Sequence, residues 1–163
     1  MLKIMVGNMC AFRDFYGMFE RYNWNALRTC EGDARNVPFR LIALLFATND
    51  DDAEYWFRQL DNVIVVQGKV YEAALPCTRI MMYALANFSL SRISCYYICE
   101  LIWLITMYYN PKESGMGNYF KLLTFHCGET VRRNLAAIQQ SHILNHPDAR
   151  ELVEIITAKV RID

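Results

Sequence analysis

Hydrophobic residues recur with a helical period along most of the chain. From Val66 to Phe88, apolar residues follow one another at intervals of three and four, which predicts an amphipathic helix of about five turns. Because this period is 3.6 rather than 2, Val70 and Tyr71 are assigned to the helix and not to a strand. Pro76 lies inside the pattern, where its missing N–H and its ring predict a bend in the helix axis.

The rest of the chain shows the same period and no sustained strand-like alternation. Pro38 marks the first turn of one helix, and Asn49 or Asp50 is a cap for the next. Ser89 or Ser91 caps an almost wholly apolar helix. The first 22 residues are the least readable and allow either a short helix or an aromatic lid. Gly32 is expected to end a short helix, and Gly128 is expected to interrupt another, which resumes at Val131. The further predicted helices are Trp24–Cys30, Asn36–Thr48, Asn49–Leu60, Ile93–Tyr109, Tyr119–Cys127, the run from Val131, and Ala149–Val160.

Helices of this length, apolar on their facing sides, have to be covered by their neighbours. Paired in chain order they form helical hairpins, which predicts an all-α fold of the α-solenoid type, a short α–α superhelix. The irregular spacing leaves an irregular globular helical bundle open as the alternative. With 163 residues, the chain is expected to form a single helical-repeat domain over residues 1–163.

Composition narrows the function classes. Lysine plus arginine and aspartate plus glutamate both total 17, so the net charge is zero, which argues against a dedicated nucleic-acid binder but allows local patches of either sign. The apolar run Ile93–Tyr109 is shorter than a membrane span and has Glu100 at its middle, so we expect it in a protein core. The six cysteines are expected as free, mostly buried thiols, which fits a reducing cytoplasm.

Residue patterns for catalysis or metal binding are weak. Cys95 and Cys99 lie four residues apart, but the second close pair of a zinc site is missing. His142 and His146 have the same spacing, but no third ligand accompanies them and a proline follows His146. We therefore expect no enzymatic activity, no metal and no cofactor. An enzyme whose residues converge only in three dimensions ranks last among the function classes.

Between Trp24 and Tyr109, short motifs follow one another in a recognisable order. They are WNAL, GDA, NVP, NDD, QLDN and, most specifically, VQGKVYEAALP. This stretch resembles a family of small bacterial HEAT-repeat proteins over roughly the middle half of the chain. The family commonly has His where this chain has Val66, which argues against a catalytic role at that position. The resemblance implies a superhelix of HEAT-like hairpins that is cytoplasmic and not enzymatic.

The resemblance also implies a function. Members of the family are often encoded beside polymorphic toxin genes and look like immunity proteins, which bind a cognate toxin domain and block it. We therefore expect a 1:1 heterodimer in which this chain occludes the toxin's active site or target surface, with no nucleic acid or membrane as partner. The alternative is a non-enzymatic helical-repeat scaffold or adaptor for an endogenous protein partner.

Candidate partner-binding residues are acidic and aromatic. The carboxylates after Asn49 exceed what capping requires, which indicates a surface patch for a basic partner. In each of two tyrosine pairs, at 96–97 and 108–109, one ring is expected to point outward, while Trp56 is assigned to the core. For residues 71 and 72, a structural role within the fold is the first interpretation, and contact with a partner is the second. The candidates are Asp50, Asp51, Asp52, Glu54, Tyr71, Glu72, Tyr97 and Tyr109.

Overall fold

Helices make up most of the protein. The structure, a computed structural model, describes residues 2–110, 118–139 and 146–161, and in these it contains seven α-helices and two small antiparallel sheets. The predicted all-α class is confirmed. The helices are α1 (Leu2–Glu20), α2 (Val37–Leu45), α3 (Asp50–Ile64), α4 (Ala74–Asn87), α5 (Arg92–Thr106), α6 (Tyr119–Gln139) and α7 (Pro147–Val160). The strands are β1 (Arg28–Thr29), β2 (Gly32–Asp33), β3 (Val65–Val66) and β4 (Lys69–Val70).

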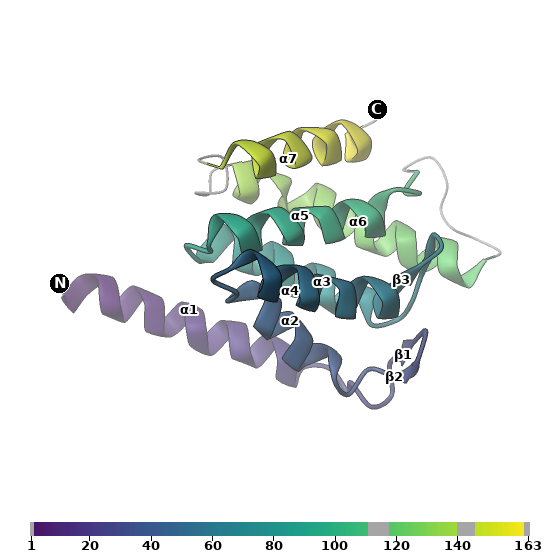
Figure 1. Cartoon of the computed structure of the whole chain (residues 1–163), viewed down its shortest axis with the longest axis horizontal. Coiled ribbons are helices and arrows are strands. Elements are labelled where there is room, and N and C mark those ends of the chain that lie inside the picture. The colour runs from purple at the N-terminus through teal and green to yellow at the C-terminus, as the bar shows by residue number, and fades with distance from the viewer. Residues whose placement is uncertain (1, 111–117, 140–145, 162–163) are drawn as a thin grey trace.

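The helices are stacked in two layers. In Figure 1, α3, α5 and α7 lie one above another, with α1 at the opposite end of the stack from α7. The most extensive contacts join α4 to α6 and α5 to α7, whereas α4 contacts its chain neighbour α5 less. Stacking of alternate helices is the arrangement expected of helical hairpins that cover one another. The superhelical form of the stack stays a prediction.

Helix starts follow the predicted caps. The α2 helix begins after Asn36 with Pro38 in its first turn. At the start of α3, Asn49 Oδ1 accepts a hydrogen bond from the Asp52 N–H at 2.9 Å. At the start of α5, Ser91 Oγ accepts from the Ser94 N–H at 3.0 Å. The same serine hydroxyl donates to the carbonyl of Ala47, so this cap also ties α5 to the end of α2.

The predicted single helix over residues 66–88 is wrong at its start. Strands β3 and β4 form a hairpin whose two turn residues, Gln67 and Gly68, both have positive φ angles, 49° and 76°. The α4 helix begins only at Ala74, so Val70 and Tyr71 lie outside it. Pro76 then falls in the first turn, where the backbone N–H groups have no helical partner, so the reason for the predicted bend disappears.

The predicted short helix at residues 24–30 is also wrong. This stretch forms turns and the first strand of the β1–β2 hairpin, and Trp24 is held by a hydrogen bond from its indole Nε1 to the carbonyl of Phe19, at 2.9 Å. The two hairpins lie at equivalent places, because Asp33 and Val70 each end a strand four residues before a helix starts. A β-hairpin followed by a helix therefore occurs twice in the chain.

Two further helices are longer than the sequence patterns suggested. Residues Leu2–Glu20 form one long helix, α1, whose Phe15 and Phe19 are buried against the core. The ring of Phe15 contacts that of Phe88 edge-on, with centroids 5.2 Å apart. The α6 helix runs through Gly128, which was expected to interrupt it. A Cβ at Gly128 would overlap the ring of Tyr109, so this glycine allows a close contact and does not end a helix.

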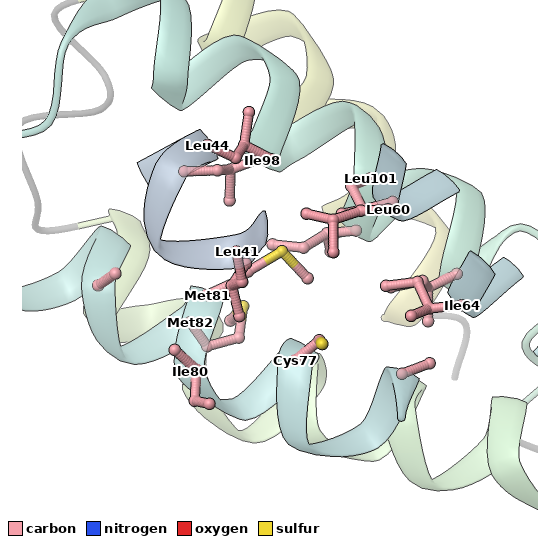
Figure 2. Packing of buried hydrophobic residues seen from close by; sticks show 14 of the residues in the cluster. Leu41, Leu44, Leu60, Ile64, Cys77, Ile80, Met81, Met82, Ile98 and Leu101 are labelled. Carbon is pink, nitrogen blue, oxygen red and sulfur yellow. The ribbon is translucent and has the colours of Figure 1, made fainter. Parts of the chain in front are cut away.

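Buried side chains from residue 15 to residue 160 form one hydrophobic cluster (Figure 2). Four of the six cysteines are buried free thiols, as predicted, and burial raises the pKa of Cys95 to about 11 and that of Cys127 to about 12. Among the described helices, none combines the length and the apolar character needed to cross a membrane. Buried residues labelled in Figure 2 are Leu41, Leu44, Leu60, Ile64, Cys77, Ile80, Met81, Met82, Ile98 and Leu101.

Candidate partner-binding surface

The predicted acidic group lies at the exposed start of α3. Asp50, Asp51, Asp52 and Glu54 are all exposed, and Asp52 Oδ2 accepts a hydrogen bond from the side-chain amide of Asn49 at 2.6 Å. In the described part of the chain, none of the three aspartates forms an ion pair. Their charge favours the positive end of the helix dipole, but only Asp52 takes part in the cap. Two aspartates are therefore left as surface charge.

Tyr97 on α5 lies beside this group. Its ring packs against Phe57 of α3 at a centroid distance of 5.3 Å, and the side chain is half-buried. Burial raises the pKa of Tyr97 to about 12, and the nearby carboxylates of Asp50 and Glu54 add to the shift. The structure thus brings together three of the predicted site residues from two different helices.

Two more carboxylates extend the acidic surface along α3 and α5. Burial raises the pKa of Glu100 and that of Asp61, and for Glu100 the negative charges of Asp61 and Glu54 add to the effect. Arg58 lies 3.7 Å from Glu54 and 3.9 Å from Asp61, so one guanidinium is shared among several acids. The sequence alone identifies Glu100 only as a charge that disfavours a membrane helix. We call Asp50, Asp51, Asp52, Glu54, Asp61 and Glu100 the acidic surface.

A hollow of about 440 Å³ opens where the first turns of α3, α5 and α7 meet. Asp50 lines it from α3 and Asp148 from α7, with Tyr96 of α5 between them. The Asp148 carboxylate is paired with the guanidinium of Arg92. The pKa of Tyr96 is raised, first by the charge of Glu100 and then by burial, with Asp148 and Asp50 contributing. The hollow is therefore lined by two carboxylates and by Arg92, which pairs with one of them, and it has an aromatic wall.

Exposed aromatic side chains adjoin the acidic surface. Phe39 of α2 is 65% exposed and Tyr55 of α3 is 55% exposed, and both rings contact Trp56 edge-on, at centroid distances of 5.3 and 4.8 Å. Trp56 itself is only partly buried, which modifies its assignment to the core. We call these three residues the aromatic ridge. The buried stripe of α3 includes Ala53 and Phe57, so the helical period alone could have placed Tyr55 on the outer side.

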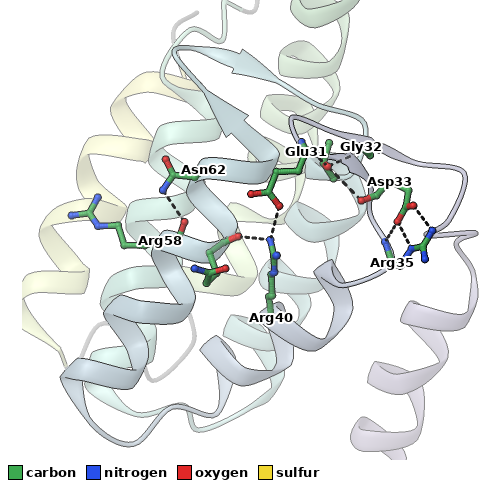
Figure 3. A network of polar contacts seen from close by, with 9 residues as sticks. Glu31, Gly32, Asp33, Arg35, Arg40, Arg58 and Asn62 are labelled. Carbon is green, nitrogen blue, oxygen red and sulfur yellow. Dashed lines mark hydrogen bonds and ion pairs between the residues drawn. The ribbon is translucent and has the colours of Figure 1, made fainter.

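Polar contacts of Arg40 join α2 to α3 and to the β1–β2 turn (Figure 3). Arg40 of α2 donates from Nη1 to the carbonyl of Gln59 in α3 at 2.9 Å, and it lies 3.6 Å from the Glu31 carboxylate of the β1–β2 turn. Just before α2, Arg35 forms a two-pronged pair with Asp33 of β2, which lowers the pKa of that carboxyl. The exposed aromatic side chains thus lie on two helices that are joined by a hydrogen bond.

Charge is segregated between the two helix layers although the net charge is zero. Helices α3, α5 and α7 carry nine carboxylates and four Lys or Arg residues, whereas α2, α4 and α6 carry one carboxylate and five Lys or Arg residues. The layer of α3, α5 and α7 therefore carries an excess of negative charge, which favours the approach of a basic surface.

Tyr71 and Glu72 are occupied within the fold. Glu72 Oε2 accepts from the backbone N–H of Arg28 at 2.8 Å, and Oε1 accepts from the Tyr119 hydroxyl. These bonds, chiefly the one from Tyr119, lower the pKa of Glu72. The ring of Tyr71 packs edge-on against Phe120 at 5.6 Å. Both residues therefore join the first hairpin to α4 and α6, which corresponds to the structural interpretation.

Tyr109 is not available to a partner, which corrects its assignment as a contact residue. It is 1% exposed, its hydroxyl donates to Glu129 Oε1 at 2.6 Å, and its ring lies over Gly128. Its neighbour Tyr108 is 65% exposed, so one ring of the pair does point outward, but it is the other one. The α5 helix ends at Thr106, so Tyr109 lies beyond the helix that was predicted to reach it.

Metal ligands are not gathered in the described part of the chain, where no group of three His, Cys, Asp or Glu residues could hold an ion. His146 takes the position before α7 without forming a side-chain cap, and His142 lies outside the described residues.

In comparisons with known proteins, no protein-family model, curated protein or solved structure matches this chain. The resemblance to HEAT-repeat immunity proteins therefore stays a prediction.

Proposed function

We propose that the protein is a non-enzymatic, cytoplasmic immunity protein that binds a cognate toxin domain and blocks its active site or target surface. The observation that supports this best is the acidic surface, six carboxylates on α3 and α5, of which Arg58 pairs with two, Glu54 and Asp61. Excess charge of one sign on a rigid surface steers a partner of the opposite charge and raises the association rate. The toxin part of the proposal rests on the family resemblance.

The partner is inferred to present a basic surface with an apolar centre. A lysine or arginine side chain of the toxin would enter the hollow between Asp50 and Asp148, where the face of Tyr96 adds a cation–π contact. The aromatic ridge, with Phe39 and Tyr55 exposed, would supply the desolvated centre of the interface, since aromatic side chains such as Tyr and Trp are typical hot spots. Binding of this kind needs no catalytic residue.

A scaffold for an endogenous partner would use the same surface, so the two proposals differ in the partner and not in the site. The discriminating experiment is co-expression with the toxin domain encoded immediately upstream. The immunity proposal predicts that toxin activity is lost and that a 1:1 complex is isolated. A toxin that stays fully active in the presence of folded protein would contradict the immunity proposal and leave the scaffold as the better explanation.

A further inference from the structure

A second and larger hollow lies at the other end of the helices, away from the acidic surface. It has a volume of about 640 Å³, within the range typical of small-ligand sites. It is formed where the β3–β4 turn, the end of α5, the start of α6 and the end of α7 come together. Its principal lining residues are Lys69, Tyr108, Phe120, Lys121, Phe125 and Lys159.

Positive charge converges on this hollow. Lys69 comes from β4, Lys121 from α6 and Lys159 from α7, and together they are three of the five lysines in the chain. The described lining residues include no carboxylate. Lys69 and Lys159, from distant parts of the sequence, therefore line one space, and their positive charge favours an anionic ligand. Lysine is a common ligand of phosphate groups.

Aromatic rings form the other wall of the hollow. Tyr108 lies against Gly68 of the β3–β4 turn, where a Cβ would come within 2.5 Å of its Cε2 atom. Phe120 is supported by Tyr71 from behind, and the ammonium of Lys69 lies 5.9 Å from the centre of the Phe120 ring. These rings are exposed or half-buried, and each is held by a neighbour. A planar ring can stack on such faces at little cost in ordering the side chains.

We propose that this hollow binds a nucleoside phosphate, with the phosphates on the lysines and the base on the aromatic wall. The site does not depend on the proposed immunity function, because it lies on other residues and has the opposite charge. The ligand class follows from the combination: lysines alone would suit any phosphate, and rings alone would suit any planar apolar molecule. Gly68, in the motif VQGKVYEAALP, is then needed for the position of Tyr108 as well as for the turn.

The test is isothermal titration of the full chain with ATP, adenosine and tripolyphosphate as probes. We expect ATP to bind more tightly than either fragment. Removing two charges with Lys69→Gln and Lys159→Gln should weaken ATP binding at least about tenfold, because each lysine contacts a charged group. Tyr108→Ala should weaken ATP by about tenfold through lost stacking, and should leave tripolyphosphate unchanged. Circular dichroism would check that each variant is folded.

The matched control is Arg13→Gln, which removes one positive charge from the exposed side of α1, outside the hollow, and should leave ATP affinity unchanged. Three results would each overturn the proposal. These are no ATP binding at millimolar concentration, tripolyphosphate binding as tightly as ATP, and ATP affinity that is the same in the double lysine variant as in the unmodified protein.

Discussion

Tyr109 and Tyr97 each lie next to carboxylates, but the two surroundings differ. At Tyr109 the hydroxyl donates to Glu129, which is also held by Arg132 at 2.8 Å, and these contacts lower the pKa of Glu129 to about 2. Near Tyr97, burial raises the pKa of Glu100 instead, and the charges of Asp61 and Glu54 add to the rise. A carboxylate that has its partners inside the fold stabilises the fold. One that lacks them weakens the fold slightly and is available to a basic partner.

The largest expected effect separates these two regions by stability. Tyr109→Ala should lower the free energy of unfolding by about 3–5 kcal/mol, because it empties a buried aromatic site and removes a hydrogen bond to Glu129. Urea unfolding would measure the loss. Tyr108→Ala is the matched control and should stay within about 0.5 kcal/mol, since that ring is exposed. Normal stability of the Tyr109 variant together with weakened toxin binding would reverse the assignment.

The next effect separates the regions by binding. Tyr55→Ala should weaken toxin binding by about 2 kcal/mol, or roughly 30-fold, if the aromatic ridge is the centre of the interface. Its free energy of unfolding should hardly change. Tyr16→Ala, on α1, removes a ring that is similarly exposed and should leave the affinity unchanged. Titration calorimetry measures the affinity of both variants for the toxin. Equal affinities of the Tyr55 and Tyr16 variants would exclude the ridge from the interface.

A smaller effect concerns pH. Because the pKa of Glu129 is lowered in the folded protein, the stability it provides is complete above its ordinary pKa of 4.5 and is lost as the pH falls towards 2. The pKa of Glu100 is raised, so its ionisation costs stability as the pH rises. Glu129→Gln should therefore lower the stability of the fold at pH 7 and make it depend less on pH between 4.5 and 2. Glu100→Gln should leave the stability at pH 7 equal or slightly higher. Thermal unfolding from pH 3 to pH 7 measures both variants. An equal loss of stability at pH 7 in the two variants would contradict the difference between Glu129 and Glu100.

Helix positions and caps were readable from the sequence because they depend on local rules. Asn49 and Ser91 act where predicted, through bonds within their own first turn. The β-hairpins were missed because their strands have only two residues each, too few for a period, and because Gln67 adopts a positive φ that its residue type does not announce. Valines at 65, 66 and 70 were the available signal, through their preference for extended backbone.

The candidate surface was readable only in part. The aspartates before Ala53 stood out in the sequence, and they are exposed as expected. Glu100 and Tyr96 join them through the packing of α3 against α5, which no local pattern specifies. The same holds for Lys69 and Lys159, which are 90 residues apart and meet only in the folded chain. Tyr109 was misplaced because the end of α5 depends on tertiary contacts.

The measurement that tests the account most directly is the association rate constant for the proposed toxin partner, at low and at high salt. Asp50, Asp51 and Asp52 changed together to Lys should slow association about tenfold at low ionic strength, and the difference should shrink as salt is added. The control, Asp14→Lys with Glu20→Lys on α1, should leave the rate nearly unchanged. An association rate for the triple variant equal to that of the unmodified protein at low salt would contradict a binding role for the acidic surface.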